Sequence, residues 1–245
     1  MKNIWLSEVF RLTAFLQDDD VDFSSWWSQI TGEEPSNRNS QPKIKVFQDE
    51  GPYAGGHLVM GKQPGRVDWL FFPSFDLQLG VPDYRELLPF EKGQEVFNEI
   101  AKRWLEISPE LKRIAFGTIL NHPVDNRTMG YSELSTYLPD VIIDTENSSD
   151  FIYQINRRRP SKVIEGLVIN RLSKWLVAIV EINRISIAPV NDLPNLKDKR
   201  YFSRVELDIN TIQTYQNVLP KEKYYNIYNE LVDLAVEIKE KGDVK

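Results

Sequence analysis

The chain has 245 residues, of which 41% are hydrophobic and 11% aromatic, as in ordinary globular proteins with a substantial core. Thirty basic and 36 acidic residues give a net charge of −6. This charge argues against non-specific electrostatic binding of nucleic acid, but it does not exclude a local basic patch. The chain has no cysteine, which excludes disulfides, thiolate metal sites and a cysteine nucleophile. It has only two histidines, so the usual zinc sites and a Ser-His triad are not favoured.

The N-terminal residues are expected to form a strand rather than a signal peptide. Glu8 and Arg11 interrupt the apolar run, and no small-residue cleavage site follows. No window approaches 18 uninterrupted apolar residues, so no membrane span and no membrane partner are expected. A reducing cytoplasm is the simplest location.

The first half of the chain is expected to contain short strands and two helices. A long strand over 4–16 is followed by a loop and a short helix over 22–30. A strand over 58–65 feeds a tight turn, and a strand-like run over 74–78 precedes an amphipathic helix within 84–107.

The second half is expected to follow the same order. Its predicted elements are a strand over 113–120, a short helix over 131–138, strands over 151–157, 163–171, 175–184 and 205–210, and a helix within 215–238. A turn at 172–174 is expected to reverse the chain, which would place Arg157 and Arg184 at one end of the sheet and Arg171 at the other.

Two helical segments have closely similar sequences. Aligned at a constant offset of 131 residues, 84–107 and 215–238 are identical at nine of 24 positions, including Tyr84 with Tyr215, Pro89 with Pro220, and Asn98 with Asn229. Their apolar residues recur with helical spacing, so Trp104 and Leu231 are expected to face a sheet. We predict an internal duplication; the alternative is two unrelated amphipathic helices of similar composition.

Each half therefore reads as a β-α-β-β-β-β-α unit, one over residues 1–110 and one over 111–245. Short turns between strands require antiparallel pairing, and two amphipathic helices per half would pack on one face, which gives an α+β fold. This order of elements resembles the duplicated repeat of the TATA-box-binding protein fold. The resemblance is one of topology and implies the fold alone. The second half also carries an inserted loop near 185–202, and such loops often add binding specificity.

One face of the second-half sheet is expected to recognise a partner. Side-chain alternation places four aromatic and acidic residues opposite the helix-covered face: Tyr153, Glu165, Trp175 and Glu181. If the turn at 172–174 sets the register, Glu165 and Glu181 lie directly across from each other. Cover by the long loop is the alternative interpretation of this face.

Five cations form a second candidate site, the basic rim: Arg157, Arg158, Arg159, Lys162 and Arg184. Clustered arginines recognise phosphate well, so an anion or nucleic-acid contact is one interpretation. A solvated turn is the other.

No catalytic residue, metal site or cofactor is expected. The aspartates over 18–22 lack the glycine and the terminal glutamate of a calcium loop, so they predict a solvated turn. Glu206 and Asp208 alternate onto one side of a strand, as metal carboxylates do in some nucleases, but they also fit an exposed polar strand face. His122 is expected to lie in a loop.

The preferred functional hypothesis is a non-enzymatic binding or adaptor protein that recognises a macromolecule, in the first place another protein, through the open sheet face and the long loop. The alternative is nucleic-acid binding by the basic rim, with Trp175 and Tyr153 stacking on bases. An enzyme that uses carboxylates is the third reading.

Overall fold

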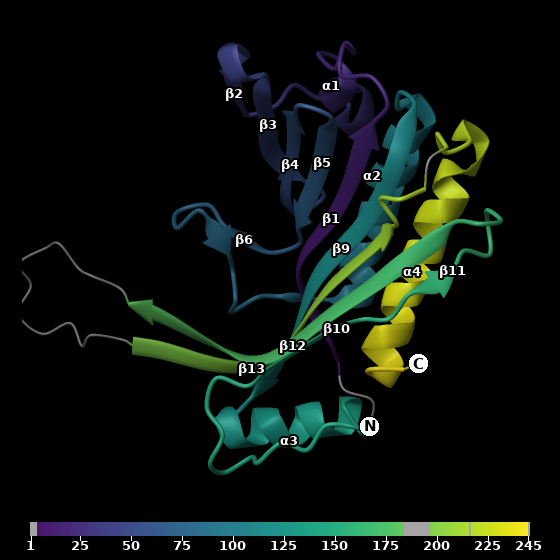
Figure 1. Ribbon diagram of the computed structural model, residues 1–245. Coiled ribbons are helices and arrows are strands. Elements are labelled where there is room, and N and C mark those ends of the chain that lie inside the picture. Colours follow the sequence, from purple (N-terminus) through teal and green to yellow (C-terminus); the bar gives the residue numbers. More distant parts are fainter. Residues whose placement is uncertain (1–3, 184–196, 216, 245) are drawn as a thin grey trace, which may run out of the picture.

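The computed structural model describes residues 4–183, 197–215 and 217–244 (Figure 1). Its helices are α1 (Trp26–Thr31), α2 (Phe90–Ile107), α3 (Arg127–Tyr137) and α4 (Tyr224–Lys241), with single 3-10 turns at Pro42–Ile44 and Lys221–Lys223. The strands of the main sheet are β1 (Leu6–Leu16), β2 (Asn37–Gln41), β3 (Val46–Tyr53), β4 (Gly56–Gln63), β5 (Arg66–Phe72), β8 (Leu88–Pro89), β9 (Leu111–Val124), β10 (Ile152–Asn156), β11 (Arg159–Pro160), β12 (Val168–Asn183) and β13 (Lys197–Thr211). Two further short strands, β6 (Phe75–Asp76) and β7 (Val81–Pro82), pair with each other.

One large sheet joins both halves of the chain. Its strand order is β10-β12-β13-β9-β1-β5-β4-β3-β2, and the strand pairings among the described residues are antiparallel. The two long strands β1 and β9 lie side by side in the middle of this sheet (Figure 1). The predicted α+β class with antiparallel strands is confirmed.

The alternation of β1 separates the two faces of the sheet. Phe10, Leu12 and Ala14 are fully buried against the helices, while Val9 and Arg11 point to the other face and are partly exposed. A helix can cover only the apolar side of such a strand, so the sequence of β1 itself decides where the helices pack.

The two long helices lie across the apolar face and touch each other (Figure 1). The Tyr228 hydroxyl of α4 donates to Asn98 Oδ1 of α2 at 3.0 Å, and Lys239 pairs with Glu91 at 2.6 Å. The sequence predicted that Trp104 and Leu231 face the sheet; both are fully buried, and that prediction is confirmed.

The shorter helices cover the ends of the same face. In α1, Trp27 stacks on Trp69 of β5 with ring centroids 6.3 Å apart. In α3, Gly130 lies so close to β12 that an added Cβ would come within 2.7 Å of Val177. The opposite side, which bears Arg11 and the even-numbered residues of β12 and β13, is the helix-free face. Within the part of the chain that the structure describes, no helix is long and apolar enough to cross a membrane.

The predicted turn at 172–174 is wrong. β12 is one continuous strand from Val168 to Asn183, so the predicted strands over 163–171 and 175–184 are largely one element. The buried Ser173 hydroxyl accepts a hydrogen bond from the indole N–H of Trp175 at 3.1 Å, and Lys174 lies opposite Glu206 of β13. Both polar residues are therefore accommodated within a strand.

The chain instead reverses before β12. Gly166, at φ +78°, adopts the left-handed conformation that glycine tolerates best, and β11 pairs with the start of β12. Arg171 consequently lies beside the end of β10, where its carbonyl accepts the Arg157 N–H at 3.2 Å. The expectation that Arg157 and Arg171 occupy opposite ends of the sheet is therefore wrong.

Two other predicted segments differ in the structure. The strand expected over 74–78 reduces to β6, which lies outside the main sheet, and β5 takes the place next to β1. Of the inserted loop near 185–202, residues 184–196, which include Arg184, lie outside the described residues. β13 begins at Lys197, so the downstream end of that loop was placed too late.

Candidate functional site

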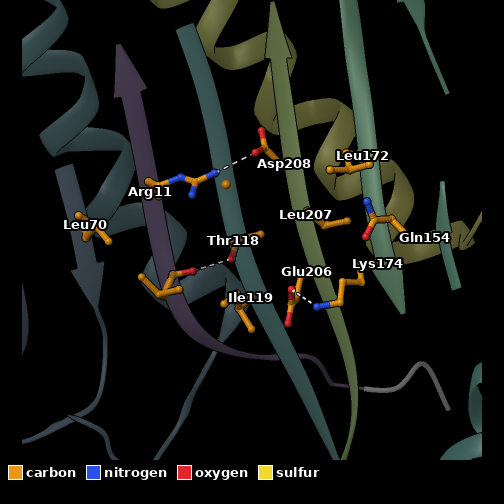
Figure 2. Close-up of a pocket in the computed structure, with 12 residues that line it drawn as sticks. Arg11, Leu70, Thr118, Ile119, Gln154, Leu172, Lys174, Glu206, Leu207 and Asp208 are labelled. Atoms are coloured by element: carbon orange, nitrogen blue, oxygen red, sulfur yellow. Dashed lines mark hydrogen bonds and ion pairs between the residues drawn. The ribbon is translucent and has the colours of Figure 1, made fainter. Parts of the chain in front are cut away.

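The helix-free face contains a cavity of about 480 Å³ in the middle of the sheet (Figure 2). Side chains of β1, β5, β9, β10, β12 and β13 line it. Its walls carry the aliphatic side chains Val9, Leu70, Ile119 and Leu172 and the charged side chains Arg11, Lys174, Glu206 and Asp208. Both halves of the chain contribute, so the cavity depends on the pairing of β1 with β9.

Arg11 crosses a neighbouring strand to reach its partner. Its Nη2 donates to Asp208 Oδ2 of β13 at 3.1 Å, although β9 lies between β1 and β13 (Figure 2). Gly117 of β9 makes this crossing possible: a Cβ there would lie 3.0, 3.1 and 3.2 Å from Nη2, Nε and Cζ of Arg11. Because this Cβ position is almost equally far from all three atoms, it must lie above the plane of the guanidinium rather than at its edge. The guanidinium therefore lies flat against the backbone of Gly117.

A second ion pair lies at the other end of the cavity. Lys174 Nζ contacts Glu206 Oε2 at 3.1 Å, and both side chains are about one-third exposed. Leu172 lies two residues before Lys174 on the same face of β12, opposite Asp208. Each exposed cation lining the cavity therefore has a carboxylate partner, and the cavity carries no net charge.

A row of amides extends from the cavity to the edge of the sheet. Asn156 donates to Asn170 Oδ1, and Asn170 donates to Asn210 Oδ1, each at 3.0 Å. Asn210 in turn donates to Asp208 Oδ1 at 2.9 Å. These bonds fix the Asp208 carboxylate from the side opposite Arg11, so the pair is held in place by four strands.

A buried ion pair borders the cavity. A register shift between Ser7 and Val9 interrupts the pairing of β1 with β9 at Glu8, a β-bulge. Glu8 accepts two bonds from Arg204, at 2.6 and 3.2 Å, and one from Asn121 at 3.1 Å. Burial lowers the pKa of Arg204, but the carboxylate of Glu8 outweighs it and raises the pKa above its ordinary value.

The residues predicted to bind a partner do not share a face. Trp175 is fully buried and stacks on Tyr137 beneath α3, and the Tyr153 hydroxyl donates to Asp243 at 2.8 Å beside the end of α4. Placing these two aromatics on the open face was wrong, because Trp175 is covered by α3 and Tyr153 is bonded at the end of α4. Glu165 and Glu181 are exposed, but Glu181 lies opposite Lys199 rather than Glu165.

Two cations of the basic rim are engaged with the C-terminal helix. Arg157 donates to Asp243 at 2.5 and 2.8 Å, and Arg159 pairs with Glu237 at 2.5 Å. Arg171, which is fully buried, also pairs with Glu237, at 3.1 Å. Of the remaining cations, Arg158 and Lys162 are exposed, and the Lys162 backbone N–H donates to Glu230 at 2.6 Å. Arg184 lies outside the described residues.

Asp243 anchors the end of the chain, which predicts a pH-dependent stability. The hydrogen bond from Arg157 holds the pKa of Asp243 below its ordinary value, although burial opposes this. A depressed carboxyl pKa adds stability above the unfolded-state pKa of about 4, and this stability is lost as the pH falls through the lower folded pKa. Asp243→Asn should therefore cost about 2 kcal/mol of unfolding free energy at neutral pH, and the difference from wild type should shrink below about pH 4.

Urea unfolding of both proteins at a series of pH values measures this difference. Asp233→Asn, at an exposed position of α4, is the matched control and should change stability by less than about 0.5 kcal/mol at neutral pH. A loss in Asp243→Asn that stays constant down to about pH 2 would contradict the assignment.

The other carboxylates considered from the sequence have protein partners. Asp19 pairs with Lys62 and accepts the Gly65 N–H at 2.9 Å, and Glu206 and Asp208 pair with cations as described. Within the described ranges, no group of three or more histidines and acidic residues could hold a metal ion.

His122 lies in strand β9, so its placement in a loop was wrong. Its Nδ1 is 2.8 Å from Glu133 Oε2, and the Ser203 hydroxyl donates to the same oxygen at 2.9 Å. Because the serine is bonded to the glutamate rather than to the imidazole, the three residues do not have the arrangement of a hydrolytic triad.

Sequence reasoning did not identify the cavity. Its central residues, Arg11 and Gly117, lie in strands that were predicted, and alternation along β1 places Arg11 opposite the apolar stripe. The pairing of β1 with β9, which brings the two residues together, has no local signal in the sequence. No family model, curated protein or solved structure matches the chain.

Proposed function

We propose that the protein is a non-enzymatic binding or adaptor protein of the cytoplasm that recognises another protein through the helix-free face of its sheet. The observation that carries this proposal is the hollow in the middle of that face, where aliphatic side chains lie among exposed, mutually paired charges. The aliphatic side chains of this hollow are not covered by a helix and are therefore accessible to a partner. Protein interfaces usually have an apolar centre surrounded by polar groups.

The arrangement of charges favours a protein over nucleic acid. Arg11 and Lys174 are paired with carboxylates of their own chain, and Arg157 and Arg159 of the basic rim are paired with carboxylates at the end of α4. A phosphate backbone would have to displace these carboxylates before it gained a cation. Glu165 precedes β12, and Glu181 lies on the opposite side of β12 from Leu172 and Lys174, so the proposal does not include the two glutamates. The long loop near 185–202 was expected to take part, but the proposal rests on the sheet face alone.

A substitution in the cavity wall tests the proposal. Leu172→Arg places a long cation in the hollow, opposite Asp208, and should leave the fold intact because Leu172 is only partly buried. The partner recovered by affinity purification of the native protein should bind this variant at least about tenfold more weakly, as expected for a contact near the centre of an interface.

Ile142→Arg is the matched control, because Ile142 is 99% exposed and lies in the segment that follows α3. Its affinity for the partner should equal that of the wild type. If Leu172→Arg binds as well as Ile142→Arg, the helix-free face is not the binding surface.

We also propose that the two halves, 1–110 and 111–245, descend from one duplicated unit with the topology of the TATA-box-binding protein repeat. Outward from the centre, the strands of the first half are β1, β5, β4 and β3, and those of the second half are β9, β13, β12 and β10. At the offset of 131 residues, Phe97 and Ile100 of α2 correspond to Tyr228 and Leu231 of α4, and all four are fully buried. These correspondences support the proposed duplication.

A further inference from the structure

The guanidinium of Arg11 lines the cavity and has one planar face against the sheet. Its inner face rests on the backbone of Gly117, as the distances from the virtual Cβ require, and its Nη2 is held by Asp208. The side chain remains about one-third exposed. A planar cation held flat in this way presents a fixed surface on which another planar group can stack, and arginine stacks readily on aromatic rings.

The walls of the cavity carry both aliphatic and polar side chains. Leu70 lies on the side of Arg11 away from Asp208, Leu172 and Gln154 lie on the strands beyond Asp208, and Ile119 lies beside Glu206 and Lys174 further along the sheet (Figure 2). The volume of about 480 Å³ is within the range of about 300–1,000 Å³ that is typical of pockets for small ligands. A single aromatic side chain fits in such a space with its ring on Arg11 and its polar edge toward the opposite wall.

The paired charges of the cavity favour a neutral planar group over an anionic one. Both cations lining the cavity are paired, so a carboxylate or phosphate would gain no free partner there. A neutral ring with one hydrogen-bonding group avoids this cost, and it can use the amide of Gln154 or the charged pair beside it. Tyrosine and tryptophan have this chemistry and are enriched among the residues that dominate protein interfaces.

We propose that the cavity receives one tyrosine or tryptophan side chain of the protein partner, stacked on the guanidinium of Arg11. This inference rests on the proposed function and adds the chemistry of its central contact. Gly117 is then a specificity-determining residue, because any side chain at this position displaces the guanidinium from its flat orientation.

The test is a titration of the ¹⁵N-labelled full-length protein with N-acetyl-tyrosinamide, followed by amide chemical shifts. Shifts should concentrate at Gly117, Thr118 and Asp208, and the dissociation constant should be about fivefold lower than that of N-acetyl-leucinamide, as expected for one cation–π contact. Gly117→Val should bind both probes equally while unfolding at nearly the wild-type temperature, since the atoms nearest to a Cβ at this position belong to the movable end of Arg11. Arg11→Lys, which keeps the charge but loses the plane, is a second variant that should show the same loss.

Equal affinity for the tyrosine and leucine probes, or no shift at these amides, would overturn the inference. Tighter binding of adenosine than of the tyrosine probe would also overturn it and would indicate a nucleobase. Capture of the partner with Leu172→Arg separates this outcome from the proposed function. If that variant loses the partner while the tyrosine probe fails to bind, only the aromatic contact is wrong, and if it retains the partner, the helix-free face is wrong as well.

Discussion

Replacing Trp104 by alanine should lower the free energy of unfolding by about 3–5 kcal/mol, the usual cost of removing a fully buried tryptophan. Trp104 is 0% exposed and lies where α1, α2 and the sheet meet, with its ring 5.7 Å from that of Trp26 and 6.5 Å from that of Trp69. Its indole N–H has no hydrogen-bond partner, so the loss comes from packing and from the cavity left behind.

Ile107→Ala provides the control within the same helix, because Ile107 is 37% exposed at the end of α2. Its cost should stay below about 1 kcal/mol. Both values follow from urea or thermal unfolding. A loss below about 1 kcal/mol for Trp104→Ala would mean that α2 packs on the sheet with a different face.

Replacing Glu8 by alanine should cost about 3 kcal/mol, because it leaves the buried guanidinium of Arg204 without its main partner. The two side chains are 9% and 14% exposed. Glu206 still contacts Arg204 Nε at 3.1 Å, which should keep the loss at the lower end of the range for broken buried pairs.

Replacing both residues by leucine separates the two contributions. The double variant Glu8→Leu with Arg204→Leu should recover most of the stability, since an apolar pair of similar size leaves no buried charge unpaired. Unfolding free energies of the wild type, both single variants and the double variant give the coupling between the two positions. Additive losses would show that the pair is not coupled in the folded protein.

The class of the fold could be predicted because its signal is local. Strands β1, β4 and β9 are apolar-rich segments bounded by polar or turn residues, and α2 and α4 repeat apolar residues at helical spacing, so these elements and the buried Trp104 could be predicted. The register of β12 could not be predicted in this way. Ser173 and Lys174 resemble a turn in sequence, and their strand environment depends on Trp175 packing below and on Glu206, which lies 32 residues later in the chain.

The two faces of the second half were also assigned the wrong way round. Trp175 points to the helices, and the even-numbered residues of β12 form the helix-free face together with Arg11. The partners of the basic rim also have no local signal, because Glu237 lies on α4 and Asp243 just after it, far along the chain from Arg159 and Arg157. Long-range pairing, rather than local propensity, decides which charges and aromatics a partner can reach.

The most direct test of the proposed binding surface is hydroxyl-radical footprinting of the protein alone and in complex with the recovered partner. Oxidation of Leu70 and Leu172, which line the cavity of the helix-free face, should fall several-fold in the complex, as expected when interface side chains lose contact with water. Oxidation of Ile142, which follows α3 and is fully open to solvent, should not change. Protection of Ile142 with unchanged oxidation of Leu70 and Leu172 would contradict the proposed binding surface.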